Sequence, residues 1–196
     1  MSAKLIFATS NTKKLEEVRH HLSEKYTVLS LADVGFTGEI EETGKTFREN
    51  AALKANFVSE KYGLDCFADD SGLEVDALGG APGVYSARFA GEPKNDRANN
   101  DLLLAKLNGI KNRKASFITV IALKIGSEIF YFEGRVEGLI SETFSGNNGF
   151  GYDPLFLPRG FTKSFAQMNL DEKNKISHRA IAVNKLVDFL KNKEAF

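Results

Sequence analysis

The sequence contains almost no cysteine. Its one cysteine, Cys66, stands in an apolar run of a chain of 196 residues. A single cysteine cannot form a disulfide within one chain, which fits a protein of the reducing cytosol. We therefore expect Cys66 to be a buried thiol and the protein to be cytoplasmic.

An excess of charge of either sign is also absent. Lysine and arginine together number 26, aspartate and glutamate also number 26, and the formal net charge at pH 7 is zero. A protein whose main partner is a nucleic-acid backbone usually carries a basic excess. The charge balance therefore predicts a partner other than nucleic acid.

Long hydrophobic runs, internal repeats and low-complexity linkers are missing as well. No apolar stretch approaches the length that spans a bilayer, and the first residues become polar too soon for a signal peptide. We expect no membrane association. Without a linker to mark a boundary, residues 1–196 are predicted to form one domain, long enough for a full core or for two lobes sharing a sheet.

Strand and helix patterns alternate along the chain, which favours an α/β fold with a mixed sheet. Strands are expected at residues 5–8, 26–31, 64–68, 115–125 and 128–136, with a hairpin turn between the last two. Helices are expected at residues 13–23, 47–62, 95–107 and 178–191. Thr46 and Glu49 have the spacing of a capping box, which predicts the start of the second helix.

Two adjacent carboxylates, Asp69 and Asp70, directly follow the apolar run 64–68. Two acids after a buried strand are costly unless they are paired or bound to a metal ion. Carboxylates at a strand end suit a hard cation such as Mg²⁺, which prefers oxygen ligands and takes phosphate as a further ligand. The simpler alternative is a turn, because aspartate and the serine and glycine that follow all favour turns.

Four more polar residues lie near the second helix. Glu41 and Glu42 precede it and could complete a carboxylate cluster for metal, or form a solvated acidic turn. Asn50 and Lys54 are four residues apart and therefore share one helical face. Both could point at the same ligand or at water.

The polar turn Thr9-Ser10-Asn11-Thr12-Lys13-Lys14 joins the first strand to the first helix. Helix N-termini attract anions through their backbone amides and partial positive charge, and Lys14 would add a full charge for phosphate. An ordinary capped loop with solvated lysines is the alternative. The turn alone does not decide between them.

A second distinctive segment is Gly149-Phe150-Gly151-Tyr152-Asp153-Pro154. An aromatic ring between two residues without side chains suits a flat base that must approach the backbone closely. A base site, a metal site and a phosphate site together indicate a nucleotide enzyme. Ser177-His178-Arg179 begins the last helix and, in isolation, is typical of a capping serine followed by two exposed bases.

Taken together, these segments resemble the inosine triphosphate pyrophosphatases, also called XTP/dITP diphosphatases. The matching segments keep the family order across nearly the whole chain: residues 9–14, 41–44, 46–47, 49–51, 54–55, 68–73, 78–88, 149–154, 172–173 and 176–179. Two departures stand out. Ser10 replaces a glycine found in many members, and Asn147-Asn148 replaces a glycine-rich lead, where asparagine tolerates left-handed backbone angles.

The resemblance implies a mixed central β-sheet flanked by helices, with two lobes, a nucleotide cleft between them, and assembly as a homodimer. It also implies Mg²⁺-dependent hydrolysis of ITP, dITP and XTP to the monophosphate and pyrophosphate, which cleanses the nucleotide pool.

The resemblance further implies roles for particular residues. Asp70 is expected to be the general base and a metal ligand, and Glu42 or its neighbour Glu41 the second metal ligand. The phosphates are expected to contact Thr9, Ser10, Asn11, Thr12, Lys13, Lys14, Lys54 and Ser71. The base and sugar are expected to contact Phe150, Gly151, Tyr152, Asp153, Lys173, His178 and Arg179.

Two other functions are compatible with parts of the sequence. One is a septum-inhibitor-type diphosphatase that acts on standard or modified pyrimidine nucleotides; the segments 149–153 and 177–179 favour the purine enzyme instead. The other is a nucleotide sensor without catalysis. A sensor has less need of the carboxylates Asp69, Asp70, Glu41 and Glu42.

Overall fold

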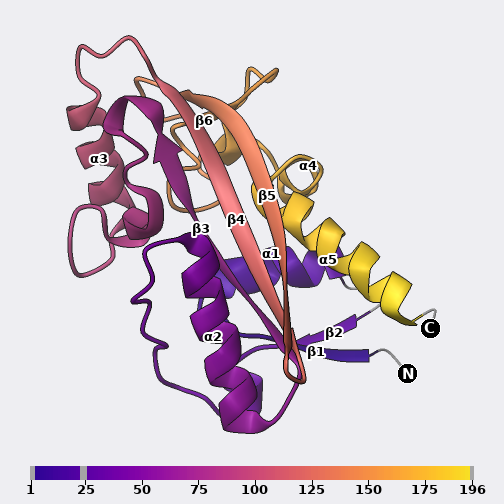
Figure 1. The fold of residues 1–196 in the computed structure, drawn as a ribbon. Coiled ribbons are helices and arrows are strands. Elements are labelled where there is room, and N and C mark those ends of the chain that lie inside the picture. The colour runs from indigo at the N-terminus through magenta and orange to yellow at the C-terminus, as the bar shows by residue number, and fades with distance from the viewer. Residues whose placement is uncertain (1–2, 23–25, 195–196) are drawn as a thin grey trace. The chain divides into compact units, whose positions relative to one another are not determined.

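The computed structural model describes residues 3–22 and 26–194 of the chain (Figure 1). The strands are β1 (Ala3–Phe7), β2 (Tyr26–Leu29), β3 (Cys66–Val75), β4 (Lys114–Ile125), β5 (Glu128–Ile140) and β6 (Phe156–Pro158). The helices are α1 (Thr12–Leu22), α2 (Phe47–Tyr62), α3 (Asp96–Lys106), α4 (Leu170–Asn174) and α5 (His178–Glu194). Short 3₁₀ helices cover Ala32–Val34, Asp76–Leu78, Gly83–Arg88 and Phe165–Gln167.

The described strands form one sheet in the order β2-β1-β3-β4-β5-β6. β1 pairs in parallel with both β2 and β3, whereas β5 and β6 are antiparallel. β4 and β5, the long arrows of Figure 1, are joined by two residues, a connection that only antiparallel neighbours can have. The predicted α/β fold with a mixed sheet is therefore confirmed.

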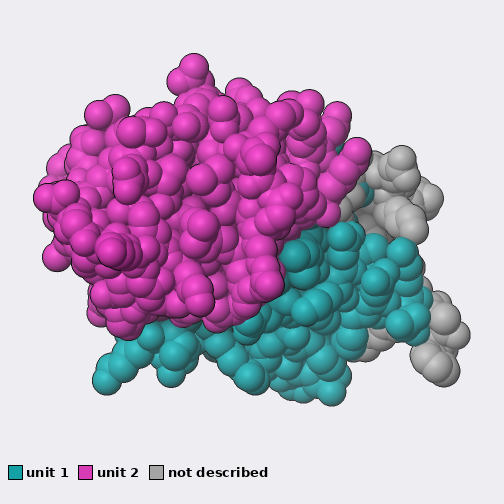
Figure 2. Space-filling model, turned by 90° about the horizontal axis from the view of Figure 1, so that it is seen from above, with its two compact units in different colours: residues 1–70, 119–134, 179–196 teal, residues 71–118, 135–178 magenta. Residues whose placement is uncertain are grey.

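The chain divides into two compact units, coloured separately in Figure 2. Unit 1 contains residues 1–70, 119–134 and 179–196, and unit 2 contains residues 71–118 and 135–178. That residues 1–196 act as a single domain stays a prediction. In the part of the chain that the structure describes, no helix has both the length and the apolarity that crossing a membrane requires.

Unit 1 has a core on each face of its sheet. Leu5 and Phe7 of β1 pack with residues of α1 and α5, whereas Ile6 and Ala8 pack with residues of α2. This division follows from the alternation of side chains along a strand. The same alternation decides where the charged residues of the neighbouring strand β3 lie.

Unit 2 has a core rich in aromatic rings. Phe117 of β4 packs edge-to-face on Phe156 with ring centroids 4.7 Å apart, and Phe165 lies 5.9 Å from Phe117. Leu103 of α3 and Tyr152 belong to the same buried cluster. This core therefore joins α3 to the loop that contains residues 149–154.

Several predicted boundaries are confirmed and some are wrong. The capping box of α2 is present: Thr46 Oγ1 accepts from Glu49 N at 3.1 Å, and Glu49 Oε2 accepts from Thr46 N at 3.2 Å. The predicted strand end at residue 68 is wrong, because β3 continues to Val75. Both Asp69 and Asp70 lie inside this strand and not in a turn.

The strand continues because its later residues again bury apolar side chains, Leu73 and Val75, in the core of unit 2. The prediction also ended β5 four residues early and omitted β6 and α4. β6 and α4 have only three and five residues, too few to show a periodic pattern in the sequence.

Cys66 behaves as predicted from its apolar neighbours. Its side chain is 0% exposed, and its Sγ donates to the carbonyl oxygen of Ala55 at 3.2 Å. Burial raises the pKa of the thiol to about 12. At pH 8 we expect no alkylation by iodoacetamide in the native protein and one modified cysteine after denaturation, measured by mass spectrometry. Labelling of the native protein within minutes would contradict this placement.

Candidate active site

Asp69 and Asp70 lie just past the end of the neighbouring strand β1. Phe7, the last residue of β1, pairs with Phe67, and β3 alone continues beyond that point. The polar turn that follows β1 begins here: the amide of Ala8 still donates to Phe67 at 2.8 Å. The carboxylates are therefore at a strand end after all, that of β1 and not of β3.

The two carboxylates have different partners because consecutive residues of a strand face opposite sides of the sheet. Asp69 contacts residues of α1 and α5, and Asp70 contacts residues of α2. Both are buried, with 1% and 5% of their surface exposed. The sequence predicted one cluster of carboxylates. In the structure, Asp69 and Asp70 are each the centre of a separate group of charges.

Asp70 is held by α2. Asn50 Nδ2 donates to Asp70 Oδ2 at 3.0 Å, and Lys54 Nζ lies 4.0 Å from Asp70 Oδ1. Lys54 Nζ also lies 2.5 Å from Oε1 of Glu42. The prediction that Asn50 and Lys54 lie on one face of the helix is thus confirmed. Both side chains contact Asp70.

Within this group the pKa values of Asp70 and Lys54 are raised, whereas that of Glu42 is lowered. Burial raises the pKa of Asp70 above its usual range, an effect that the charges of Lys54 and Lys14 do not overcome. Burial acts to lower the pKa of Lys54, but Asp70 and Glu42 outweigh it, so that pKa is raised. Burial likewise opposes ionisation of Glu42, but Lys54 outweighs it and the pKa of Glu42 is lowered. Asp70 is therefore the carboxylate of this group whose pKa is raised, whereas that of Glu42 is lowered.

These residues also bear on metal binding. Glu42 and Asp70 already share one cation, the ammonium group of Lys54, whereas Glu41 is exposed. Among residues 3–22 and 26–194, no group of three or more His, Cys, Asp or Glu side chains could hold a metal ion by itself. Glu42 and Asp70 could hold a divalent cation together with ligands that are not part of the protein.

Asp69 is the centre of the second group. Lys14 Nζ lies 3.2 and 3.0 Å from its two carboxylate oxygens, and Arg179 Nε lies 3.5 Å from Oδ2. Arg179 Nη1 in turn pairs with the buried carboxylate of Glu17. Burial lowers the pKa of Lys14 more than Asp69 raises it.

Glu17 was not predicted as a site residue. Its only sequence signal is its position three residues after Lys14, which places both on one face of α1. Arg179 was predicted to contact the base, yet its ion pairs are with Glu17 and Asp69 of unit 1. These contacts favour a role in holding Asp69, and a role in base recognition stays a prediction.

The turn between β1 and α1 is locally a capped loop. Asn11 Oδ1 accepts from the amides of Lys13 and Lys14 at 3.0 and 3.2 Å, and Thr9 Oγ1 accepts from Asn11 N at 3.2 Å. Ser10, Thr12 and Lys13 are exposed. Lys14 is half-buried, and its ammonium group pairs with Asp69. Phosphate binding by this turn stays a prediction. Ser71, the first residue of unit 2, is half-buried in β3.

In unit 2 the segment 149–153 folds around one carboxylate. Asp153 Oδ2 accepts from the amide of Phe150 at 2.8 Å and from Lys173 Nζ at 2.7 Å. The ammonium group of Lys173 lies 5.1 Å from the centre of the Phe150 ring. Gly149 has φ +75°, and a Cβ there would lie 2.0 Å from Asp153 Oδ2, so a side chain is excluded. Asp153, Lys173 and Phe150 are therefore brought together as predicted from the sequence.

His178 and Tyr152 take buried positions in the same unit. The imidazole of His178 stacks on Phe117 with centroids 4.6 Å apart and an interplanar angle of 6°. The hydroxyl of Tyr152 donates to the backbone oxygen of Ser86 at 2.8 Å, and burial raises its pKa above the usual range. The side chain of Tyr152 thus belongs to the core, and its contact with the substrate stays a prediction.

The lead into this loop differs from the prediction. No residue other than glycine has a positive φ in the described chain, so Asn147 and Asn148 are not in the left-handed region. Gly146 and Gly149, with φ of 85° and 75°, take that conformation. The side chain of Asn148 instead donates to Met168 O at 3.1 Å and ties the loop down.

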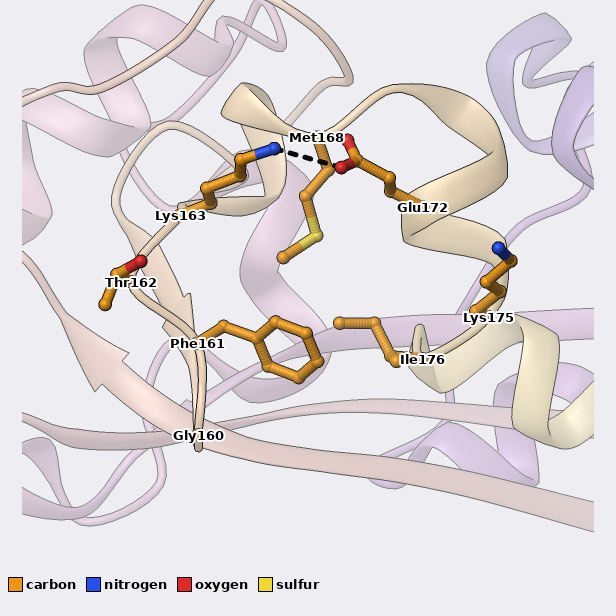
Figure 3. Close-up of a pocket in the computed structure, with 8 residues that line it drawn as sticks. All are labelled: Gly160, Phe161, Thr162, Lys163, Met168, Glu172, Lys175 and Ile176. Atoms are coloured by element: carbon orange, nitrogen blue, oxygen red, sulfur yellow. Dashed lines mark hydrogen bonds and ion pairs between the residues drawn. The ribbon is translucent and has the colours of Figure 1, made fainter.

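A separate pocket of about 480 Å³ lies in unit 2 (Figure 3). The apolar side chains of Phe161, Met168 and Ile176 face one another in it, and Lys163 Nζ pairs with Glu172 Oε1 at 2.9 Å along its edge. None of the predicted site residues lines this pocket. It therefore gives no support to a particular role.

Comparisons with known proteins agree on one family. A model of the Ham1 family matches residues 5–189. The chain is 52% identical over 187 residues to a dITP/XTP pyrophosphatase of Christiangramia forsetii, covering 95% of this chain and 98% of that protein. It is 50% identical over 189 residues to that of Bacillus subtilis, covering 94% and 96%. The solved structure of the Staphylococcus aureus Ham1 protein matches with a TM-score of 0.88 and 40% identity, covering 97% and 99%.

Proposed function

The chain belongs to the Ham1 family, and from this premise we propose that it hydrolyses ITP, dITP and XTP to the nucleoside monophosphate and pyrophosphate. The observation that carries the proposal is the pair of charged groups on β3: the buried Asp70 contacts Asn50 and Lys54 on one face, and Asp69 pairs with Lys14 on the other. We further propose that the enzyme acts in the cytoplasm as a homodimer.

In this proposal the triphosphate is handled by side chains of unit 1. Lys54 and Lys14 are cations already bound to carboxylates, so phosphate oxygens could replace carboxylate oxygens as their partners. Lys54 stays protonated because its pKa is raised. The exposed Ser10, Thr12 and Lys13 are additional donors at the start of α1.

The residues present fit Mg²⁺, the cofactor we propose. Glu42 and Asp70 would hold it: both offer oxygen ligands, and both already converge on the single cation of Lys54. Two carboxylates complemented by substrate phosphates are the usual ligand set of Mg²⁺ in phosphoryl-transfer enzymes. When bound, the ion would neutralise the charge of the phosphates and orient the attacking water.

Asp70 is the residue that we propose as the general base. Hydrolysis forms a bond from the water oxygen to the α-phosphorus, breaks the bond to the bridging oxygen of pyrophosphate, and releases one proton from the water. A carboxylate with a raised pKa accepts that proton more readily than an ordinary one. Asn50 holds Oδ2 of Asp70, which fixes the orientation of the carboxylate.

The base is handled, in the same proposal, by Phe150, Asp153, Lys173 and His178 of unit 2. Phe150 is half-buried and its ring offers a face for stacking, and Asp153 offers an acceptor. A sensor without catalysis would not need a buried carboxylate with a raised pKa such as Asp70. The pyrimidine diphosphatase is disfavoured because the chain matches the Ham1 family over residues 5–189.

The proposal is tested by identifying the products and replacing the base. Wild-type protein with ITP and Mg²⁺ should release IMP and pyrophosphate in equal amounts, with no free phosphate. Asp70→Asn keeps the shape of the side chain but removes its charge and its basicity, so we expect kcat to fall by at least ~10². The exposed Asp76→Asn is the matched control and should keep the wild-type rate.

Two outcomes would contradict these assignments. Release of free phosphate without pyrophosphate would mean that a different bond is broken. A variant Asp70→Asn with a raised KM and an unchanged kcat would make Asp70 a binding residue. Thermal unfolding of both variants separates loss of the base from loss of the fold.

A further inference from the structure

Two side chains of helix α3 form hydrogen bonds with Gly151, the middle residue of the loop 149–153. One bonds to its amide and the other to its carbonyl oxygen. The amide of Gly151 donates to Asp96 Oδ2 at 2.7 Å, and the carbonyl oxygen of Gly151 accepts from Asn100 Nδ2 at 2.7 Å. Asp96 and Asn100 are four residues apart, so they project from one face of the helix. Both contacts lie within unit 2.

Gly151 needs such support for two reasons. It has no side chain to pack, and its φ of +60° is a conformation that glycine samples among many others. Its neighbours have contacts of their own: the amide of Phe150 donates to Asp153 within the loop, and the hydroxyl of Tyr152 donates to Ser86 O. The contacts with α3 therefore hold the residue that links Phe150 to Tyr152.

The buried position of Asn100 leaves one of its two polar atoms without a partner in the described part of the chain. The side chain is 2% exposed, and its Oδ1 is buried without a hydrogen-bond partner in the described part of the chain. An unpaired buried acceptor is unfavourable, and an apolar side chain would avoid it only by removing the donor to Gly151 O. The other polar atom of the Asn100 side chain, Nδ2, donates to Gly151 O and Asp96 O.

We propose that Asp96 and Asn100 are positioning residues that set the purine selectivity of the enzyme by fixing the backbone of the loop at Gly151. The proposal rests on the proposed function, in which this loop receives the base. If Gly151 moves, the ring of Phe150 and the carboxylate of Asp153 move with the chain on either side. Misplacement of about 1 Å in a binding group costs up to ~10²-fold in rate.

The helix provides a matched control for each residue. Asn99 is as buried as Asn100, at 2% exposed, but its hydrogen bonds are to Ala87 O at 3.0 Å and Ala90 N at 2.7 Å. Asp101 is exposed, like Asp96, and pairs with Arg97. Neither Asn99 nor Asp101 bonds to the loop in any of these contacts.

The experiment measures kcat and KM for ITP and for ATP in Asp96→Ala and Asn100→Ala, with Asp101→Ala and Asn99→Ala as controls. We expect the ratio of kcat/KM between ITP and ATP to narrow by about 10-fold or more in the first two, mainly through KM for ITP. Asn99→Ala should lower the melting temperature but keep the ratio. Asp96→Asn keeps an acceptor for Gly151 N and should restore the wild-type ratio.

Several outcomes would overturn the inference. One is an unchanged ratio of kcat/KM between ITP and ATP in both Asp96→Ala and Asn100→Ala. Another is an equal narrowing of that ratio in Asn99→Ala, which would show that the effect follows from lost stability. Should Asn100→Ala fail to fold, the exposed position Asp96 decides alone. A wild-type enzyme without preference for ITP would instead contradict the proposed function, and the inference with it.

Discussion

Excess EDTA is expected to abolish hydrolysis of ITP, and Mg²⁺ added beyond the chelator to restore it. Glu42 has a lowered pKa and is ionised at neutral pH, so it repels a triphosphate. Lys54 is paired with Glu42, and phosphate would compete for it. A divalent cation is needed to bridge the carboxylates and the phosphates. Pyrophosphate release at constant pH measures the effect.

The two neighbouring glutamates give this prediction a sharper form. We expect the Mg²⁺ concentration for half-maximal rate to rise in Glu42→Gln, because one ligand oxygen loses its charge. Glu41 is exposed, and Glu41→Gln should require no more Mg²⁺ than the wild type. Full activity in EDTA would remove the metal assignment for Glu42 and Asp70, and an equal rise in both variants would mean that Glu41 also binds the ion.

The second large effect is the rejection of ATP, for which we expect kcat/KM to be lower than for ITP by ~10⁴. Hypoxanthine and xanthine carry an oxygen at position 6 and a hydrogen on N1, whereas adenine has an amino group and a bare nitrogen. A donor for the oxygen and an acceptor such as Asp153 for N1–H match the first pattern. With adenine, the donor faces the amino group and the acceptor faces the bare N1, so these buried polar atoms are left unpaired.

Guanine shares the 6-oxo group and the N1 hydrogen, so we expect weaker rejection of GTP than of ATP. Stacking on Phe150 serves every purine equally and cannot separate them. Rates for ITP, XTP, dITP, GTP and ATP under one condition test the order. Equal rates for ATP and ITP would contradict recognition of position 6.

Two neighbouring residues test where the donor lies. His178→Phe keeps a ring to stack on Phe117 but has no N–H group, so we expect it to narrow the ratio between ITP and ATP. Arg179→Lys disturbs the contacts with Glu17 and Asp69 and should lower kcat/KM for both nucleotides equally. The reverse result would assign the donor to Arg179, the other of the two residues that the resemblance to the family implied.

Features that depend on near neighbours in the chain were predictable before the fold was known. The capping box of Thr46 and Glu49, the hairpin of β4 and β5, and the shared face of Asn50 and Lys54 all depend on residues a few positions apart. Such patterns are local, because periodicity and capping act over about one helical turn or one strand. The family motifs likewise pointed to Asp153, Phe150 and Lys173, which the structure brings together.

Contacts between distant segments were decided only by the tertiary structure. Asp69 and Asp70 look like one acidic pair in the sequence, but strand geometry places them on opposite faces, where different helices supply their partners. Glu17 pairs with Arg179 across 162 positions, and Asp96 bonds to Gly151 across 55. No local rule relates residues so far apart, since their meeting depends on how the whole sheet and its helices pack. These contacts, and not the composition of any motif, set the charge and the rigidity of the proposed site.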